Sequence, residues 1–262
     1  MTVVWIGAGN LATRIALAMR AAGITILQVY SQTESHAATL AQQLDCAWTS
    51  DLAAVRSDAD YYFFALKDTA LPEVVARLSP NEGTWVHTAG SMPMTLFAGH
   101  AKQYGVCYPL QTFSKTRAVD VSKVPFFIEG SDVETEGRLC ALAGLLSASV
   151  QRLSSEKRKS LHLAAVFACN FVNHLYVLGG ELLEKEGIDT HFLLPLIDET
   201  AAKVHDMSPL AAQTGPAVRY DEHVIQKQLA QLEADPAKQA IYSLMSQSIH
   251  QHCKSWVVSI TI

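Results

Sequence analysis

The sequence predicts an α/β fold in two parts, a mostly parallel β-sheet covered by helices and then an all-helical domain. Two observations indicate this arrangement. Over residues 1–153, short apolar runs alternate with helical patterns, which is typical of a parallel sheet whose strands are joined by helices. After residue 153 the pattern is helical almost to the end of the sequence. We therefore expect one domain over residues 1–153 and a second over residues 154–262.

The predicted strands of the first domain are short runs rich in β-branched and aromatic residues. Helical patterns lie between them, and Gly23 stands where the first helix should end. The strands are predicted over residues 2–7, 25–30, 61–66, 84–88, 105–109, 125–130 and 150–153, and the helices over residues 10–23, 35–44, 69–78 and 133–148.

The second domain is predicted to be a series of helices. The first begins at Ser154 or Ser155, since serine is a favoured N-cap, and stops at Gly187, since glycine is favoured just beyond a helix. The helices are predicted over residues 154–187, 191–207, 215–233 and 236–256.

The turn after the first strand has the form G-x-G-x-x-A. Its first glycine allows a tight turn, its second lets a pyrophosphate approach the backbone, and its alanine lets the helix pack closely on the strand. Because the string follows a strand and opens a helix, it predicts a Rossmann-type dinucleotide site rather than a plain turn. The expected cofactor-binding residues are Gly7, Ala8, Gly9, Asn10, Leu11 and Ala12.

The end of the second predicted strand indicates which dinucleotide binds. NAD sites commonly carry Asp or Glu there, to hold the ribose 2′-hydroxyl. Here Ser31, Gln32 and Thr33 follow the strand, and Glu34 comes where the next helix should start. Hydroxyl and amide groups donate hydrogen bonds to a 2′-phosphate without repelling it, although no arginine stands here to bind that phosphate. The sequence therefore favours NADP over NAD.

Two further turns follow strands of the same predicted sheet. Open α/β sheets bind ligands at the carboxyl ends of their strands. We therefore assign Leu66, Lys67 and His87 to the cofactor site and count His87 and Ser91 among the candidate catalytic residues. It is an equally open interpretation that His87 and Ser91 only cap this turn.

The predicted helix over residues 161–180 is largely apolar but carries four polar side chains. Buried amides and imidazoles need hydrogen-bond partners. At 100° per residue, with His162 at zero, Asn173 lies at about 20°, Asn170 at about 80° and His174 at about 120°, all on one side. The stretch has the length of a membrane span, but these polar groups favour a core helix.

The next two predicted helices also carry polar groups in apolar settings. Glu199 and Lys203 are four residues apart, Thr214 is the predicted N-cap of the third helix, and Arg219 follows in its first turns. Structural interpretations stay open: a surface ion pair, Arg219 paired with a neighbouring aspartate, or Asn and His groups that satisfy one another or cross a dimer interface. Together, however, these groups indicate a cleft between the domains that binds a substrate.

Composition argues against several kinds of partner and site. The net charge is −5 and the Lys and Arg residues are scattered, so we expect neither nucleic-acid nor membrane binding. The five cysteines form no CxxC pair, which favours reduced thiols in a cytoplasmic protein and gives no support to a metal site. The first residues have no signal-peptide pattern, which also favours the cytoplasm.

Strings spread over nearly the whole sequence resemble a known family. They are "GAGN", "HTAGS", "YPLQTFS", "LHLAAVFACNFVNHLY", "PLIDET" and "AQTGPAVRYD". The first domain resembles the dinucleotide domain of pyrroline-5-carboxylate reductases, prephenate dehydrogenases and deazaflavin-dependent NADP reductases. The whole chain resembles the Rossmann-like NADP oxidoreductases whose C-terminal half is a 6-phosphogluconate dehydrogenase-like helical domain of unknown function.

The resemblance implies a reductase or dehydrogenase whose C-terminal helices form a homodimer. It also implies that the helix start at Thr214 holds a substrate carboxylate and that Gln111 and Thr112 face the substrate. The sequence departs from the family at Gln32, where many NADP-using relatives carry a basic residue.

We therefore expect an NADP-dependent oxidoreductase that acts on a C=O or C=N group of a small, carboxylate-bearing metabolite. His162 and His87 are the candidate proton donors, with Lys203 as a competing donor. The other candidate catalytic or substrate-binding residues are Asn170, Asn173, Ser91, Gln111, Glu199, Thr214 and Arg219. Two alternatives are a non-catalytic NADP(H)-binding sensor and a deazaflavin-linked NADP reductase.

Overall fold

The computed structural model describes residues 1–260 of the chain, with side chains described through Lys254. It divides into two compact units, the first over Met1–Phe171 and the second beginning at Val172. The domain boundary predicted at residue 153 falls where the sheet ends, before the helix that joins the units, and it stays a prediction.

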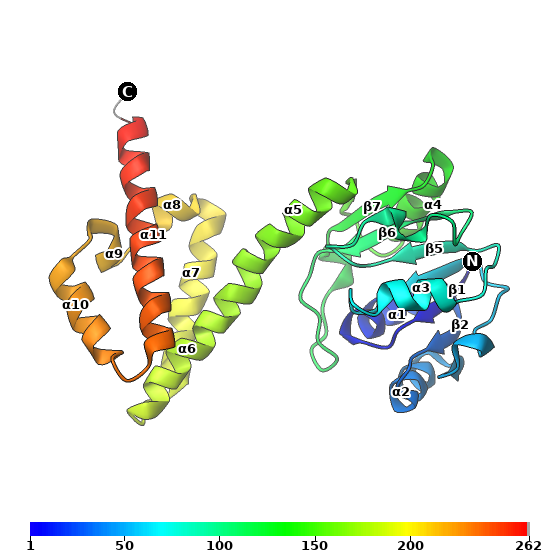
Figure 1. Cartoon of the computed structure of the whole chain (residues 1–262), viewed down its shortest axis with the longest axis horizontal. Helices are drawn as coiled ribbons and strands as arrows, with labels where there is room; N and C mark the ends of the chain where they lie inside the picture. Colours follow the sequence, from blue (N-terminus) through cyan, green and yellow to red (C-terminus); the bar gives the residue numbers. More distant parts are fainter. Residues whose placement is uncertain (261–262) are drawn as a thin grey trace. The chain divides into compact units, whose positions relative to one another are not determined.

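The first unit is built on an eight-stranded sheet with the order β3-β2-β1-β4-β5-β6-β7-β8 (Figure 1). Strands β1 to β6 run parallel, β7 is antiparallel to β6, and β8 is parallel to β7. This mostly parallel sheet confirms the predicted α/β fold. The strands are β1 (Thr2–Ile6), β2 (Thr25–Tyr30), β3 (Ala47–Thr49), β4 (Tyr61–Phe64), β5 (Thr84–His87), β6 (Tyr104–Pro109), β7 (Phe126–Gly130) and β8 (Val150–Arg152).

Helices cover both faces of the sheet. On one face α1 (Asn10–Ala21), α2 (Glu34–Leu44) and α4 (Val133–Gly144) pack against the core cluster that contains Trp5 and Phe63. On the other face α3 (Leu71–Arg77) and the short helix η2 (Met94–Phe97) pack against the cluster that contains Phe64 and Trp85. Two further short helices of this unit are η1 (Leu52–Ala54) and η3 (Val121–Lys123).

Burial on both faces explains the nearly continuous apolar runs of the strands. The Phe97 ring lies 5.0 Å from that of Phe64 and meets that of Trp85 edge-on at 5.8 Å. Trp5 and Phe63 are in ring contact at 5.1 Å on the opposite face. These contacts fix the central strands β1, β4 and β5 in place.

The register of the parallel strands brings their carboxyl ends to one edge of the sheet. Ile6 lies opposite both Tyr30 of β2 and Phe64 of β4. Phe64 in turn lies opposite His87 of β5, which pairs with Val106 of β6. The turns that follow these strands therefore share this carboxyl edge.

Helix α5 (Ser155–Ala165) begins beside β7 rather than at the edge of the sheet. Ser154 is its N-cap, as predicted, and its hydroxyl accepts a hydrogen bond from the Lys157 N–H. The backbone N–H and the hydroxyl of Ser155 donate to the two oxygens of Glu129, at 3.0 and 2.7 Å. The start of α5 is thus attached to β7 by its first residues.

A π-helical segment, η4 (Val166–Phe171), separates α5 from α6 (Val172–Lys185) within one long helix. The predicted helix over residues 154–187 is therefore confirmed, and Gly187 follows its end with φ of 67°. A π-helix bonds each residue to the fifth one along, so its turns are wider than α turns. The angles of Asn173 and His174 relative to His162, which assume a regular α-helix, are therefore wrong.

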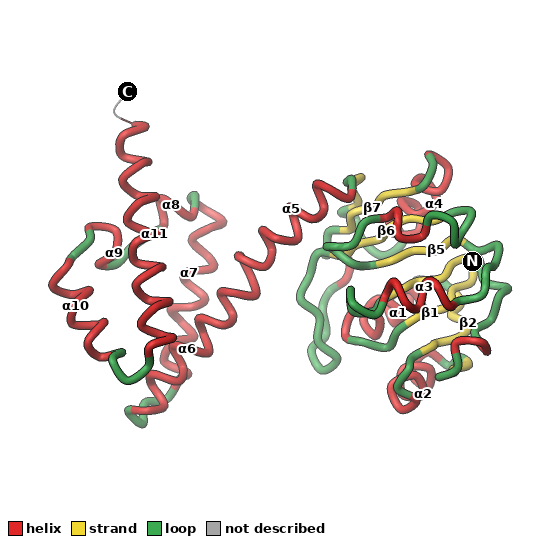
Figure 2. Tube along the Cα trace, viewed as in Figure 1, coloured by secondary structure: helices red, strands yellow, loops and turns green. Residues whose placement is uncertain are grey.

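The described residues of the second unit form helices joined by loops, and none of them forms a strand (Figure 2). One predicted helix, residues 215–233, is divided in two. Tyr220 adopts the left-handed conformation, with φ of 53°, and Asp221 caps a new helix by accepting from the Val224 N–H. After α6 come η5 (Thr190–Leu193), α7 (Leu194–Asp206), α8 (Pro209–Ala212), α9 (Pro216–Arg219), α10 (Glu222–Gln231) and α11 (Pro236–Ile260).

Candidate active site

The turn between β1 and α1 leaves space for a ligand beside its glycines. Gly7 has φ of 118°, and a Cβ there would lie 2.3 Å from the carbonyl oxygen of Ala65, so glycine is required. A Cβ on Gly9 would meet nothing within 4 Å, and Gly9 caps α1 without a side-chain hydrogen bond. The first N–H groups of α1 are therefore free to bind an anion such as a phosphate.

The other residues of this turn fit the same site. Ala12 is fully buried and lets α1 approach the sheet closely, while Leu11 packs at the edge of the core. Ala8 is buried and Asn10 is exposed. No acidic residue lies in the first turn of α1, so nothing there repels a phosphate. The residues present at this turn therefore fit a dinucleotide.

The end of β2 lies next to the turn, because the Gly7 N–H donates to the Tyr30 carbonyl at 2.7 Å. Ser31 follows and is half-buried, and its hydroxyl accepts a hydrogen bond from the Thr33 N–H at 3.3 Å. Gln32 and Thr33 are exposed. Hydroxyl and amide groups are thus present where a ribose or its 2′-phosphate would be bound.

Residues after β4 and β5 meet at the same edge. Leu66 lies beside Gly7, since its Cδ2 would be 3.2 Å from a Cβ on that glycine, and Lys67 is exposed. The Ser91 hydroxyl, after β5, donates to the Asp68 carboxylate, after β4. This hydrogen bond joins the two turns and places Ser91 at the carboxyl edge.

His87 is enclosed by the protein. Its side chain is fully buried, its ring lies 5.6 Å from that of Phe97, and its Nδ1 accepts from the Ala89 N–H at 3.2 Å. Burial, together with the positive charge of Arg158, lowers the pKa of His87 to about 3. A neutral, enclosed imidazole is poorly suited to donate a proton to a substrate, so the structure favours a role for His87 in holding its turn.

His162 of α5 lies against the carboxyl edge and is paired with Tyr108 at the end of β6. The Tyr108 hydroxyl and His162 Nδ1 are 3.0 Å apart, and the two rings are edge-on. Burial raises the pKa of Tyr108, so its phenol stays protonated near neutral pH. Sequence reasoning does not single out Tyr108, which lies in the predicted strand over residues 105–109 and has the apolar neighbours Val106 and Leu110 at strand spacing.

The Tyr108–His162 pair lines a cavity of about 430 Å³. Three other predicted residues, Gln111, Thr112 and Asn170, line the same cavity. Its remaining walls come from Leu110, which follows β6, and from apolar side chains of α5 and η4. The structure thus brings together one titratable pair and several hydrogen-bonding groups in a mainly apolar pocket, which is the usual composition of a small-molecule site.

A buried ion pair holds α5 in this position. The Arg158 side chain is fully buried, and its Nη1 lies 2.6 Å from Glu129 Oε2. Its Nη2 donates to the Met92 carbonyl at 2.6 Å and to the Ser155 hydroxyl at 3.1 Å. Arg158 and His162 are one helical turn apart, so this anchor directs His162 toward Tyr108.

The remaining predicted residues belong to the second unit. The half-buried Lys203 and the exposed Glu199 form a pair on α7, with 3.8 Å between Nζ and Oε1. Asn173 and Arg219 are exposed. Thr214 does not cap a helix as predicted, because Gly215 caps α9, which has only four residues. The carboxylate site expected at Thr214 stays a prediction.

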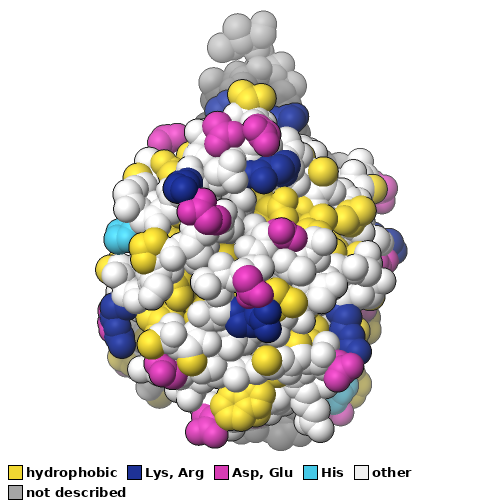
Figure 3. All heavy atoms as spheres, turned by 90° about the vertical axis from the view of Figure 1, so that its right-hand side faces the viewer, with side chains coloured by type: hydrophobic (Ala, Val, Ile, Leu, Met, Phe, Trp, Pro, Cys, Tyr) yellow, Lys and Arg dark blue, Asp and Glu magenta, His cyan; other side chains and the backbone are white. Residues whose placement is uncertain are grey.

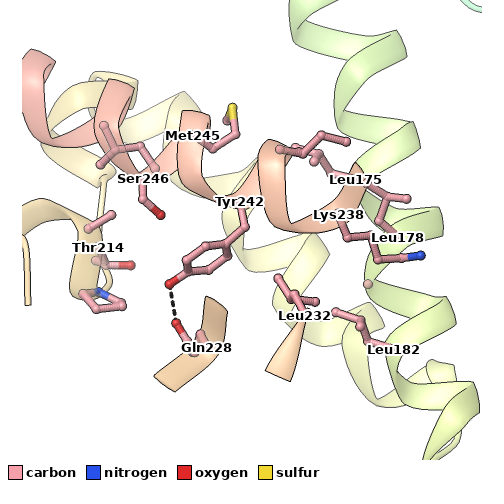
Figure 4. Close-up of a pocket in the computed structure, with 15 residues that line it drawn as sticks. Leu175, Leu178, Leu182, Thr214, Gln228, Leu232, Lys238, Tyr242, Met245 and Ser246 are labelled. Carbon is pink, nitrogen blue, oxygen red and sulfur yellow. Dashed lines mark hydrogen bonds between the residues drawn. The ribbon is translucent and has the colours of Figure 1, made fainter. Parts of the chain in front are cut away.

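Thr214 instead lines an apolar groove of about 360 Å³ within the second unit (Figure 4). Leu175, Leu178 and Leu182 of α6 form one wall, and α9, α10 and α11 form the others. The Tyr242 hydroxyl in this groove donates to Gln228 Oε1 at 2.5 Å.

The part of the chain that the structure describes contains no cluster of His, Cys, Asp and Glu able to hold a metal ion. It contains one helix, Ser155–Lys185, that is long and apolar enough to cross a membrane, and the apolar window of this helix is not buried. On the face of the molecule in Figure 3, basic and acidic side chains are interspersed with apolar ones.

The chain is similar to solved structures over nearly its whole length. A crystal structure of a candidate NADP oxidoreductase from Bacteroides fragilis is 51% identical, with a TM-score of 0.90, and the match covers 95% of this chain and 98% of that one. The chain belongs to this family of NADP oxidoreductases. Two family models agree with this membership. Residues 2–86 match the family described as NADP oxidoreductase, coenzyme F420-dependent, and residues 124–249 match a domain of unknown function, DUF2520.

More distant structures share the fold of the family. Pyrroline-5-carboxylate reductase from Streptococcus pyogenes is 15% identical, with a TM-score of 0.62 and coverage of 97% of this chain and 98% of that one. A reductive aminase from Aspergillus terreus, solved with NADPH and ethyl levulinate, is 18% identical, with a TM-score of 0.67 and coverage of 97% and 94%. No protein with curated annotation matches the sequence. The resemblance found in the sequence is thus confirmed, and a nicotinamide cofactor follows from the family.

Proposed function

We propose that the protein is an NADPH-dependent reductase of a C=O or C=N group on a small, carboxylate-bearing metabolite. The observation that carries the proposal is the Tyr108–His162 pair, which lines a mainly apolar cavity beside the carboxyl edge of the sheet. The match to NADP oxidoreductases supports the redox class, and the glycine turn supports the nucleotide.

The cofactor would supply a hydride, so the substrate oxygen or nitrogen that gains negative charge must receive a proton. Tyr108 is a suitable donor, because its phenol stays protonated and faces His162. The imidazole would return a proton to the phenolate after transfer, and Gln111, Thr112 and Asn170 would orient the substrate. This assigns the proton path to Tyr108 and His162 and not to His87 or Lys203.

The choice of NADP over NAD forms part of the same proposal. Ser31, Gln32 and Thr33 offer hydrogen-bond donors at the end of β2 and no carboxylate that would repel a 2′-phosphate. The reductive aminase of similar fold was solved with NADPH, which supports this preference.

A homodimer formed through the C-terminal helices is also proposed. The apolar window of the helix Ser155–Lys185 is not buried within one chain, and Phe167 and Phe171 are among its exposed residues. An apolar surface of this extent marks an interaction site, and a second copy would cover it. We propose further that the protein acts in the cytoplasm and, as its substrate, takes a small molecule rather than nucleic acid.

Kinetic measurements with NADPH and a panel of small keto and imino acids test the proposal. Tyr108→Phe and His162→Gln should each lower kcat by about 10²- to 10⁴-fold and leave the NADPH dissociation constant unchanged. Turnover that survives both substitutions would assign the chemistry to other residues. NADPH binding without turnover on any substrate would favour a non-catalytic sensor.

A second candidate function is favoured by the family model over residues 2–86, whose description names coenzyme F420. In that case the electron donor or acceptor would be a deazaflavin rather than a keto or imino acid. Oxidation of NADPH by added F420, measured through deazaflavin absorbance, distinguishes the two. Rapid oxidation would replace the first proposal with this one.

A further inference from the structure

The connection between β6 and β7 carries two basic side chains without a carboxylate partner. Lys115 and Arg117 are exposed. Neither forms an ion pair with any of residues 1–254, whose side chains the structure describes. The Arg117 N–H donates to the Ser114 hydroxyl at 3.2 Å, which closes a tight turn around them. Phe113 before the turn and Val119 after it pack against the core, so both ends of the turn are fixed.

Arg14 of α1 holds this turn. Its Nε donates to the Ser114 carbonyl at 2.8 Å, and its Nη2 donates to the Lys115 carbonyl. Arg14 lies one helical turn after Asn10, the first residue of α1, and helical side chains lean toward the N-terminus of their helix. The backbone of Ser114 and Lys115 is therefore held beside the first turns of α1.

The start of α1 is also where the dinucleotide pyrophosphate belongs. The glycine turn offers free N–H groups there but no cation, because residues 7–12 include neither Lys nor Arg. The turn with Lys115 and Arg117 follows β6, which lies on the β4 side of β1, whereas the ribose-binding end of β2 lies on the other side. These two cations are thus placed for the pyrophosphate rather than for the 2′-phosphate.

We propose that Lys115 and Arg117 bind the pyrophosphate of the nicotinamide dinucleotide, with Arg14 positioning the turn that carries them. The inference rests on the proposed use of a nicotinamide cofactor and adds the charged part of its site. The cations would cover the pyrophosphate from the side opposite the α1 N–H groups and neutralise its charge.

Calorimetric titration with NADPH, NADH and ADP-ribose tests the assignment in the full-length protein. These three ligands share a pyrophosphate, and only NADPH carries a 2′-phosphate. Lys115→Ala and Arg117→Ala should each weaken the binding of all three ligands by the same factor, about threefold to tenfold. A higher salt concentration should reduce the difference in affinity between each variant and wild type. Arg14→Gln should weaken the binding of the three ligands to a similar extent. In the double variant Arg14→Gln, Lys115→Ala, the loss of binding free energy should be smaller than the sum of the losses in the two single variants.

Lys123→Ala is the matched control. Lys123 is an exposed lysine near the end of the same connection, but it pairs with Asp120 at 3.5 Å. The control should bind all three ligands as wild type does. Bound ligand should also protect wild-type protein from trypsin after Lys115 and Arg117.

Three outcomes would overturn the assignment. A loss confined to NADPH would move both cations to the 2′-phosphate. Wild-type affinities in Lys115→Ala and Arg117→Ala, with trypsin cleavage unaffected by ligand, would remove them from the site altogether. A wild-type protein that binds none of the three ligands would overturn the proposed function itself, and this inference with it.

Discussion

Gly90 is in direct contact with the His162 imidazole. A Cβ at Gly90 would lie 2.6 Å from His162 Nδ1, the atom that faces Tyr108. Gly90→Ala should therefore displace the ring and break its hydrogen bond to Tyr108. We expect kcat to fall at least tenfold while NADPH affinity is kept, with a loss of about 1–3 kcal/mol in the free energy of unfolding from overpacking.

Gly137 provides the control for this substitution. It lies within α4, where a Cβ would meet nothing within 4 Å, and alanine is the better helix former there. Gly137→Ala should leave kcat unchanged and stabilise the protein slightly. If Gly90→Ala keeps full kcat, His162 does not need its present position for turnover.

His87 should make the stability of the protein depend on pH. Its pKa is about 3 in the folded protein against 6.5 when solvated, so the unfolded chain takes up this proton first as pH falls. The contribution of His87 to the free energy of unfolding is therefore fully present above pH 6.5 and is lost progressively toward pH 3. Between pH 7.5 and pH 5, this residue should remove about 2 kcal/mol from the free energy of unfolding.

Urea unfolding at the two pH values checks this expectation. His87→Gln keeps an acceptor for the Ala89 N–H but cannot be protonated in this range. The variant should lose about 2 kcal/mol less than wild type on acidification. Equal losses would show that other groups determine the acid sensitivity.

The burial of His87 and the pairing of Tyr108 are two facts that the sequence does not reveal. A strand covered on both faces gives no alternation from which the enclosure of His87 could be read. The Tyr108–His162 contact joins residues 54 positions apart and depends on how α5 returns to the sheet. The glycine turn, by contrast, is local, so its residues can be recognised from their spacing alone.

At the scale of elements, the Arg158–Glu129 pair fixes α5 to β7. Removing one partner of a buried ion pair leaves the other charge unpaired and costs about 3–5 kcal/mol. Arg158→Met should lower the free energy of unfolding by that amount, and adding Glu129→Gln should recover part of it. Arg77→Met, which breaks the exposed pair with Glu73, should cost less than about 1 kcal/mol in the same urea titration.

If Arg158→Met costs no more than Arg77→Met, the buried pair does not anchor the helix. A true anchor should also affect the site, so Arg158→Met should lower kcat at a temperature where the variant is still folded.

Periodicity predicts most elements of the fold because each long segment shows its own face pattern. The exceptions have local causes. Strand β3 has only three residues, too few to show a pattern. The break between α9 and α10 depends on the left-handed conformation of Tyr220, which a tyrosine rarely adopts. The π segment η4 leaves the apolar composition of its helix unchanged, so no pattern marks it.

For the whole molecule, the exposed apolar helix predicts a dimer. Phe167 and Phe171 are 63% and 50% exposed and are in edge-on contact with each other. Sedimentation analysis should give twice the mass of one chain, and the double substitution Phe167→Asp and Phe171→Asp should shift the protein toward the monomer. Charges buried against a second copy would be unpaired, which is the reason for the shift.

Val133→Asp is the control for the dimer. Val133 is 89% exposed at the start of α4, so an added charge there should leave the mass of the assembly unchanged. A wild-type protein that sediments as a monomer, or that is recovered only with membranes, would contradict the proposed dimer.

The reversal of β7 and β8 has a consequence for how this chain tolerates insertions. Because β7 and β8 both run away from the carboxyl edge, α5 starts partway along the sheet and runs in the direction of that edge. Arg158 and His162 are one turn of helix apart, so an inserted residue between them would swing the imidazole by 100° away from Tyr108. Natural variation in length is therefore not expected between the anchor and the imidazole.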